Sequence, residues 1–295
     1  MERILVTGSE GFIGRKLVES LQNSPHEVFG IDSKAGAKST QQVDITSSSL
    51  KGFIKEIQPT VIVHLAAQID VRKSFQDPLH DLKVNAEGTL GLLLASVGEK
   101  LKHFLYIHSG GAIYDSNSPL PLTEESPLNP QSPYGLTKQI GEGYVRVLCE
   151  NSQVAWTSLA LSNCFGPVKD HGRGVIYEFW KRLSEGTQCE IFGAENTRDF
   201  VYVDDVVRAI NLAIPKPSNC RINISSGTEV SLKNLYEIMA EMLSSEQAPI
   251  VRHAKFGEVT RSCLSNDKAQ QIYGWRPKID FKDGLKLAIA QNSSK

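Results

Sequence analysis

The stretch Thr7-Gly8-Ser9-Glu10-Gly11-Phe12-Ile13-Gly14 decides the fold of this chain. It comes directly after an apolar run, Arg3–Val6, that is typical of a buried strand, and it opens a segment of helical periodicity. In such a strand–turn–helix, Gly8 permits the tight turn, Gly11 lets the backbone approach a pyrophosphate, and Gly14 permits close packing of helix and strand. The phosphates would bind the amide groups at the helix N-terminus. The glycine spacing therefore predicts a dinucleotide-binding turn.

The rest of the first half repeats this alternation of strand and helix. Buried strands are expected at Arg3–Val6, Val28–Ile31, Val61–Leu65 and Phe104–Ile107. Helices are expected at Gly11–Gln22, Leu50–Ile57, Leu79–Gly98 and Tyr134–Asn151. This rhythm predicts an α/β fold with a Rossmann-type parallel sheet, helices on both faces, and a ligand at the carboxyl ends of the strands.

Beyond Asn163 the alternation of strand and helix patterns is interrupted by segments that contain Gly and Pro, which are typical of turns. Further strands are expected at Val154–Leu161, Glu190–Phe192 and Phe200–Val203. We predict a smaller C-terminal α/β lobe that binds the substrate. The expected division is a dinucleotide-binding Rossmann domain of residues 1–163, to which residues 195–214 return, and a lobe of residues 164–295.

The composition narrows the class of protein. Hydrophobic residues make up 40% of the 295 residues and charged residues 22%, with a net charge of −1. This balance predicts no nucleic-acid partner, and no apolar run is long enough to predict a membrane span. The five cysteines include no C-x-x-C pair, which favours free thiols in a reducing compartment and no metal site. Because the sequence enters a strand at Arg3, we expect no signal peptide and a cytoplasmic protein.

An acidic residue, Asp32, ends the second expected strand. A carboxylate at this place can accept hydrogen bonds from both ribose hydroxyls of a dinucleotide and would repel a 2′-phosphate. Asp32 therefore favours NAD over NADP, although the nearby cations Lys34 and Lys38 would tolerate NADP. Asp44 and Ile45 follow one short segment later, where the adenine edge would be bound.

Four further stretches match one protein family in chain order. They are His64-Leu-Ala-Ala-Gln68, Asp77-Pro78 with Val84-Asn-Ala-Glu-Gly-Thr89, Ser132-Pro-Tyr134-Gly-Leu-Thr-Lys138, and Arg198-Asp-Phe-Val-Tyr-Val-Asp-Asp205. With the glycine turn, they make the chain resemble the extended short-chain dehydrogenases/reductases that act on nucleotide sugars, in particular the UDP-glucose 4-epimerase branch. The resemblance runs from Arg3 to about Trp275-Arg-Pro277. It implies that NAD is the cofactor and that further contacts to it come from Phe12, Ile13, Leu65, Ala66, Ala67 and Asn85.

Tyr134 and Lys138 lie four residues apart in a helix-forming segment, so their side chains share one face. To act as a base near neutrality, a tyrosine must lower its pKa from about 10 by roughly 3 units. The ammonium of Lys138 is expected to supply much of this change, and a bound oxidised nicotinamide would add to it. In the resembled family these two residues and a serine form the catalytic group, and both also contact NAD.

The serine of that group is assigned to Ser109, which ends the fourth expected strand and would bond the reacting oxygen. Many family members read S-S-S-x-x-V-Y, whereas this chain has His108-Ser109-Gly110-Gly111-Ala112-Ile113-Tyr114. Anchoring the match on the strand selects Ser109, whereas anchoring it on Tyr114 selects Gly110. The Asp-Glu pair that sugar 4,6-dehydratases place after their Thr is missing from the segment, which argues against elimination of water.

The resemblance places most contacts to a nucleotide sugar in the C-terminal lobe. They fall on Asn163, Val175, Ile176, Phe192, Arg198, Lys255 and Ser262. Phe192 would pack on the base, and the guanidinium of Arg198 would bind phosphate, unless it instead pairs with Asp199 or Asp205.

Two of these assignments carry specific expectations. Lys255 stands where many relatives have a second phosphate-binding arginine, and its neighbours Arg252 and Arg261 are alternatives. Ser262 stands where a large aromatic residue tends to exclude N-acetyl sugars, so the small side chain is expected to admit a UDP-N-acetylhexosamine.

Together these features predict an NAD-dependent nucleotide-sugar 4-epimerase that works through a transient 4-keto sugar. A nucleotide-sugar reductase or dehydrogenase would use the same catalytic group, and a non-catalytic NAD or nucleotide-sugar sensor would use the same fold. The resemblance also implies a homodimer formed through the helices Leu79–Gly98 and Tyr134–Asn151, although core burial would explain the same apolar positions. His64, at the end of a buried strand, is expected to be packed and hydrogen-bonded rather than a base.

Overall fold

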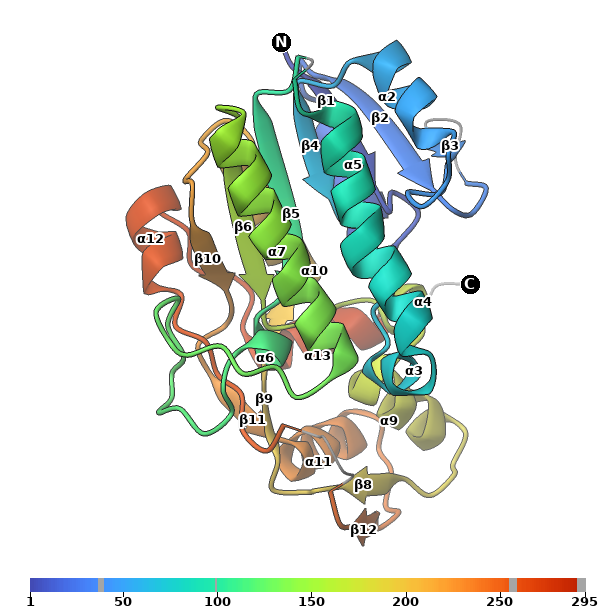
Figure 1. Cartoon of the computed structure of the whole chain (residues 1–295). Helices are drawn as coiled ribbons and strands as arrows, with labels where there is room; N and C mark the ends of the chain where they lie inside the picture. Colours follow the sequence, from blue (N-terminus) through green and yellow to red (C-terminus); the bar gives the residue numbers. More distant parts are fainter. Residues whose placement is uncertain (37–39, 99, 255–258, 291–295) are drawn as a thin grey trace. The chain divides into compact units, whose positions relative to one another are not determined.

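A computed structural model describes residues 1–36, 40–98, 100–254 and 259–290 (Figure 1). Its largest sheet has seven strands in the order β10-β6-β5-β4-β1-β2-β3. Their bounds are β1 Arg3–Thr7, β2 Glu27–Asp32, β3 Thr40–Gln42, β4 Val61–His64, β5 His103–Ser109, β6 Ala155–Leu161 and β10 Arg221–Ile224. β1 pairs in parallel with both β2 and β4, β2 with β3, and β4 with β5. The predicted Rossmann-type parallel sheet is confirmed.

The strand order reverses between β1 and β4, which is where such sheets bind dinucleotides at the carboxyl ends of the strands. Four strands end at, or directly before, residues for which the sequence predicted a role in the site. β1 ends at Thr7, β2 at Asp32, β4 at His64 and β5 at Ser109. The parallel pairing of these strands therefore brings the glycine turn, the acidic residue and the serine to one edge of the sheet.

Helices cover both faces of this sheet. Figure 1 shows α5 and α7 side by side in front of it, with α2 beside them. The bounds are α1 Phe12–Leu21, α2 Leu50–Ile57, α4 Pro78–Leu82, η1 Lys83–Glu87, α5 Gly88–Ser96 and α7 Pro133–Asn151. Leu5 packs into the core under α2 and α5, whereas its neighbours Ile4 and Val6 point to the opposite face and are also fully buried.

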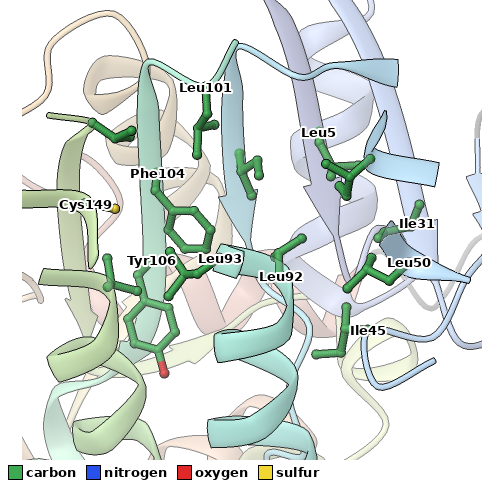
Figure 2. Close-up of a cluster of buried hydrophobic side chains, with 14 of the residues drawn as sticks. Leu5, Ile31, Ile45, Leu50, Leu92, Leu93, Leu101, Phe104, Tyr106 and Cys149 are labelled. Carbon is green, nitrogen blue, oxygen red and sulfur yellow. The ribbon is translucent and has the colours of Figure 1, made fainter. Parts of the chain in front are cut away.

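The core on the front face joins the sheet to α2, α5 and α7. Leu5, Ile31 and Phe104 come from the strands, and Leu92 and Leu93 meet them from α5 (Figure 2). Ile62 of β4 belongs to the same cluster. α2 spans the predicted residues Leu50–Ile57 and buries Leu50, Phe53, Ile54 and Ile57, the spacing of one helix face. This apolar packing holds the strand ends that carry the candidate site in fixed positions.

The helix expected at Leu79–Gly98 is three consecutive helical segments. α4 begins after the cap of Asp77, whose carboxylate accepts a hydrogen bond from the amide of His80. A π-helical segment, η1 at Lys83–Glu87, follows and contains Asn85, and α5 completes the run. π-helical turns are often found at functional sites.

The chain divides into two compact units. Unit 1 comprises residues 1–113, 128–160 and 207–222, and unit 2 comprises residues 114–127, 161–206 and 223–295. The segment expected to return to the first domain, 195–214, is β9 (Thr197–Tyr202) followed by α10 (Val203–Ala213). The strand that joins the edge of the seven-stranded sheet comes later in the chain and is β10.

Unit 2 contains two small sheets and several helices. A three-stranded sheet has the order β11-β9-β7, and a two-stranded sheet pairs β12 with β8. The bounds are β7 Asn163–Phe165, β8 Glu190–Phe192, β11 Glu229–Ser231, β12 Ile250–Arg252, α8 Val168–His171, α9 Gly174–Ser184, α11 Leu232–Met242, α12 Asp267–Tyr273 and α13 Phe281–Ala290. The remaining short helices, α3 Val71–Gln76 and α6 Gly110–Ile113, belong to unit 1. Among the helices described, none has the length and apolar character needed to cross a bilayer.

Candidate active site

The glycine turn is packed as tightly as its sequence predicted. Gly8 has a φ of +69°, and a Cβ there would lie 2.7 Å from the amide nitrogen of Ala66, just after β4. A Cβ on Gly14 would lie 2.1 Å from the carbonyl oxygen of Gly8. Larger residues would force the turn away from α1 and β4. The turn is therefore shaped by its glycines to bring backbone amides close to a ligand.

The N-terminus of α1 suits a pyrophosphate. Gly11 is its N-cap, and no side chain among the described residues caps it. An uncapped helix start with no acidic residue in its first turn attracts an anion. Phe12 and Ile13, the other residues expected to contact NAD, form the first turn and are partly exposed. The glycine turn and the helix start together fit a dinucleotide.

Asp32 lies at the end of β2 and is partly exposed. Its Oδ2 accepts a hydrogen bond of 3.1 Å from the amide of Glu10 in the glycine turn, and its Oδ1 accepts one of 3.1 Å from the amide of Lys34. A carboxylate has room for further donors such as ribose hydroxyls, so this position fits NAD. Lys38, the other cation considered for NADP, lies outside the described residues.

The remaining residues expected at the cofactor differ in exposure. Asp44 is exposed, with Oδ1 bound to the amide and hydroxyl of Thr46, whereas Ile45 packs in the core. Leu65, Ala66 and Ala67 follow β4 and are partly exposed beside the glycine turn. Asn85 is buried, and its side chain bonds to Gln68, Asp81 and Thr137. The contacts of these residues to NAD stay predictions.

The structure brings Ser109 and Tyr134 together, with Lys138 one turn further along α7. The side chain of Ser109 lies close enough to Tyr134 to act on the phenol as a hydrogen-bonding group. α7 begins at Pro133 after the cap of Ser132, whose hydroxyl accepts a bond of 3.1 Å from the amide of Gly135. Of the two positions left open, Ser109 is therefore the one whose side chain meets the tyrosine.

A second glycine allows this approach. A Cβ on Gly135 would lie 2.2 Å from the carbonyl oxygen of Ala112, in the short helix α6 that follows Ser109. The start of α7 can therefore pack directly on the turn after β5, which places Tyr134 beside Ser109.

Burial dominates the electrostatics of the pair. Burial raises the pKa of Tyr134 above its ordinary value of 10.0, the hydrogen bond with Ser109 lowers it, and the charge of Asp81 raises it. The sequence led us to expect a lowered pKa at Tyr134, and this expectation is wrong for the protein alone, because desolvation of the phenolate outweighs the hydrogen bond. Burial also lowers the pKa of Lys138 to about 7, against the opposing charge of Asp81.

The interpretation of His64 as a packed histidine is confirmed. Its Nδ1 lies 2.7 Å from Thr7 Oγ1 and its Nε2 lies 2.9 Å from Thr89 Oγ1, so both ring nitrogens are bonded. Burial, together with the charge of Lys138, lowers the pKa of His64 to about 3, which keeps the ring neutral. No cluster of His, Cys, Asp or Glu among the described residues has the arrangement of a metal site.

Two of the predicted substrate residues in unit 2, Asn163 and Arg198, lie on neighbouring strands of the three-stranded sheet. β7 pairs in parallel with β9 so that Asn163 lies opposite Phe200, two residues from Arg198 on the same face of the small sheet. Arg198 donates 2.7 Å hydrogen bonds to the carbonyl oxygens of Thr197 and Val259. Ser262 belongs to the segment that follows Val259 and is buried. Asn163 is exposed and available to a ligand.

The acidic neighbours of Arg198 have structural partners. Asp199 is buried and accepts hydrogen bonds from the amides of Ser226, Gly227 and Leu264. Asp205 accepts bonds of 2.9 and 3.0 Å from the amides of Lys278 and Ile279. These bonds tie the two ends of the Arg198–Asp205 stretch to later parts of unit 2.

The other expected substrate residues are spread over unit 2. Val175 and Ile176 are in the first turn of α9, where Ile176 is buried. Phe192 ends β8 opposite Arg252 of β12. Among the cations left open, Arg252 pairs with Glu190 at 3.0 Å and Arg261 with Glu229 at 2.6 Å, whereas Lys255 lies outside the described residues.

The sequence alone did not identify two buried acidic residues beside the catalytic pair. Glu142 lies one turn beyond Lys138 on α7, in contact with His108 of β5 and Arg221 of β10. Asp81 of α4 bonds to Thr137, the residue before Lys138. Counting four residues on from Lys138 would have found Glu142, whereas no local pattern shows that Asp81 meets α7.

Comparison with known proteins agrees with this geometry. The profile of the NAD dependent epimerase/dehydratase family matches residues 4–225. A UDP-glucose 4-epimerase of Mycolicibacterium smegmatis is 34% identical over 304 residues, which cover 97% of each chain. The crystal structure of a Thermotoga maritima UDP-glucose 4-epimerase with UDP-glucose has a TM-score of 0.94 and 32% identity, covering 99% of this chain and 100% of that one.

A second solved structure has its cofactor bound. The UDP-glucose 4-epimerase of Thermus thermophilus in complex with NAD has a TM-score of 0.90 and 31% identity, covering 99% of each chain. The family match extends over most of the sequence, and these relatives align over nearly all of it. The chain belongs to the NAD-dependent epimerase/dehydratase family, as an NAD-dependent epimerase.

Proposed function

We propose that this enzyme inverts the configuration at C4 of a UDP-linked hexose or N-acetylhexosamine through a transient 4-keto sugar. The observation that carries the proposal is the juxtaposition of Ser109 and Tyr134, with Lys138 on the next turn of the same helix. The relatives that align over nearly the whole chain support the choice of a UDP sugar, since they are named UDP-glucose 4-epimerases.

The chain supplies the proton chemistry of this reaction. Tyr134 would take the proton of the C4 hydroxyl as the sugar is oxidised and return it to the same oxygen as the sugar is reduced. Ser109, which lies beside Tyr134, would hold that oxygen in reach. Oxidised NAD, when bound, would accept the C4 hydride and give it back, and its positive charge would favour the ionised form of the tyrosine.

The protein holds the cofactor through the parts already described. The glycine turn and the start of α1 would bind the pyrophosphate, and Asp32 would bind the adenine ribose. Because the hydride returns to the sugar, the reaction consumes no cofactor. A reductase with the same catalytic group would instead consume one NADH for each product molecule.

The substrate range follows from the small residue at position 262. Ser262 is buried, and its hydroxyl has no hydrogen-bond partner among the described residues. We expect both UDP-glucose and UDP-N-acetylglucosamine to be epimerised. Turnover of UDP-glucose without any turnover of UDP-N-acetylglucosamine would contradict this assignment.

The test is incubation of the pure enzyme with UDP-, GDP- and dTDP-hexoses, with products identified by NMR, first without added NAD and then with it. We expect UDP-glucose and UDP-galactose to interconvert without net change in NADH. Tyr134→Phe should lower kcat by about 10²–10⁴-fold with little change in KM, because it removes the acid–base group.

Tyr144→Phe is the matched control, since Tyr144 lies on the same helix and is exposed. It should keep wild-type kcat. A Tyr134→Phe enzyme with wild-type kcat, or stoichiometric consumption of NADH by the unaltered enzyme, would refute the proposed reaction.

A further inference from the structure

Asp81 is a fully buried carboxylate on α4 that is not part of the proposed catalytic group. Its Oδ1 accepts hydrogen bonds from Gln68 Nε2 at 2.7 Å and Asn85 Nδ2 at 3.2 Å. Its Oδ2 accepts a bond from Thr137 Oγ1 at 2.5 Å. All three partners act as donors to it, which is the environment that suits an ionised carboxylate.

Thr137 connects this carboxylate to the catalytic turn of α7. It lies between Tyr134 and Lys138, and its hydroxyl is also 3.1 Å from the carbonyl oxygen of Tyr134. The side-chain amide of Asn85 reaches the same hydroxyl at 3.3 Å. α4 and η1 are therefore bonded to the turn of α7 that places the proposed base and its lysine.

The charged and titratable groups around Lys138 come from four elements. From β4, the buried His64 is close enough for the charge of Lys138 to lower its pKa. From β5, the ring of Tyr106 lies 4.7 Å from Lys138 Nζ, and the buried His108 is beyond it. From α7 come Tyr134 and Glu142, and Glu142 is already paired with Arg221 and His108. From α4 comes Asp81, whose negative charge raises the pKa of Lys138 while burial lowers it.

We propose that Asp81 is a positioning residue for the reaction. Through Thr137, this buried carboxylate holds the turn of α7 that carries Tyr134 and Lys138. This inference rests on the proposed function, because it assumes that Tyr134 and Lys138 carry out the proton transfer.

The direction of the effect follows from the signs of the charges. A negative charge raises the pKa of both Tyr134 and Lys138, so its removal in Asp81→Asn lowers both. In a pH profile of kcat, the acid limb requires ionised Tyr134 and the basic limb requires protonated Lys138. Both limbs should therefore move to lower pH in Asp81→Asn. Loss of packing alone would lower kcat and leave the limbs in place.

The direct experiment titrates Lys138 by NMR in protein labelled with ¹³C at the lysine ε-carbon and saturated with NAD. Lys138→Arg identifies the resonance, which is expected to stand apart because burial brings this lysine to titrate near neutrality. We expect Asp81→Asn to lower the titration midpoint by about one pH unit. An unchanged midpoint would overturn the role of the charge. The measurement needs no substrate, so it can be read even if the proposed reaction proves wrong.

Asp205→Asn is the matched control, because it also neutralises a buried carboxylate that accepts hydrogen bonds, in unit 2. It should leave the midpoint of Lys138 unchanged even if it lowers Tm. A midpoint that moves as far in Asp205→Asn as in Asp81→Asn would show a general loss of structure and overturn the assignment.

Thr137→Val separates position from charge, since it removes the hydroxyl and keeps Asp81. We expect kcat to fall at least tenfold with KM and both limbs unchanged, and Thr137→Ser to restore it. If Asp81→Asn fails to fold, the comparison of Thr137→Val with Thr137→Ser still tests the positioning role. Wild-type kcat in Thr137→Val would overturn the positioning role.

Discussion

At the scale of single residues, the carboxylate of Glu142 shows how a charge is kept inside unit 1. Its side chain is only 8% exposed, and it receives the guanidinium of Arg221, whose Nε lies 2.9 Å from Oε1. His108 Nε2 lies 3.3 Å from the same oxygen. Burial would raise the pKa of Glu142, but His108 and Arg221 together bring it well below its ordinary value of 4.5.

This lowered pKa makes the stability of the protein depend on pH. A carboxylate with a depressed folded-state pKa adds stability that is fully present above its unfolded pKa and is lost as the pH falls through the folded one. We expect Glu142→Gln to lower the free energy of unfolding by about 3 kcal/mol at pH 7, because it removes the buried carboxylate that pairs with the guanidinium of Arg221. The difference from the wild type should shrink as the pH falls below 4.5.

Urea unfolding of both proteins from pH 7 to pH 3 would measure this difference. Glu150→Gln on the same helix is the control, since the pair that Glu150 forms with Arg146 at 3.8 Å is exposed. It should change stability by less than about 0.5 kcal/mol. A Glu142→Gln difference that is independent of pH would contradict the account.

The residues of the site that could be predicted are those whose partners are close in sequence. Tyr134 and Lys138 are four residues apart, so helical periodicity alone places them on one face. The choice of Ser109 over Gly110 needed the structure, because only the packing of α6 against α7 shows which residue meets Tyr134. Asp81 was missed for the same reason, since its bond to Thr137 spans 56 positions of the chain.

At the scale of elements, the close packing of α1 on the glycine turn predicts that a larger residue at Gly14 will displace the helix. Gly14→Ala would push a Cβ to 2.1 Å from the carbonyl oxygen of Gly8, so α1 must shift away from the turn. We expect a loss of about 1–3 kcal/mol in stability and at least a tenfold weaker affinity for NAD. Isothermal titration with NAD and thermal unfolding measure the two effects.

Gly52→Ala serves as the comparison, because a Cβ there meets nothing within 4 Å and the position is inside α2. It should raise stability by up to about 1 kcal/mol and leave NAD affinity unchanged. Equal NAD affinity in Gly14→Ala and the wild type would show that the close approach at Gly14 is not needed for binding.

The elements predicted from sequence are those with a strong apolar signal. α2 was predicted with its observed bounds, since Leu50, Phe53, Ile54 and Ile57 repeat with helical spacing and are all buried. β3, with the sequence Thr-Gln-Gln, is an edge strand whose residues are exposed or half-buried, so it carries no apolar pattern. β10 was missed because its four residues follow a Pro-rich turn and its place beside β6 is a long-range pairing.

At the scale of the whole molecule, exposed apolar side chains gather on helices of unit 1. Leu94 of α5 is 64% exposed, and Tyr144 and Val147 of α7 are 40% and 44% exposed. α5 and α7 lie side by side on the front face of the sheet (Figure 1). Apolar groups in such number on adjacent helices favour the predicted homodimer.

A double variant tests this prediction. Leu94→Glu with Tyr144→Glu should convert a dimer into a monomer, because two charges would have to be buried in the contact. Sedimentation velocity at micromolar concentration measures the mass. Leu287→Glu on α13 is the control, since Leu287 is also exposed but belongs to unit 2. A wild-type protein that sediments as a monomer would refute the dimer.

The fold class followed from the alternation of apolar runs and helical segments, and the structure confirmed it. The division into domains stays a prediction, because a chain that leaves one compact unit and returns to it twice gives no local signal of where it crosses. The contacts of the substrate residues also stay predictions, since they depend on a ligand and on Lys255 outside the described part.

The residues proposed for catalysis and cofactor binding in unit 1 lie at the carboxyl ends of the parallel strands. The turns that precede the strands lie at the opposite, amino ends of the sheet. The turn between α1 and β2, at residues 22–26, and the turn between α2 and β4, at residues 58–60, precede their strands and hold none of the residues assigned to catalysis or binding. An affinity tag or fluorescent reporter inserted into the first of these turns would therefore be a full strand length away from the carboxyl ends of the strands, so we expect the tagged enzyme to keep the NAD affinity of the untagged one.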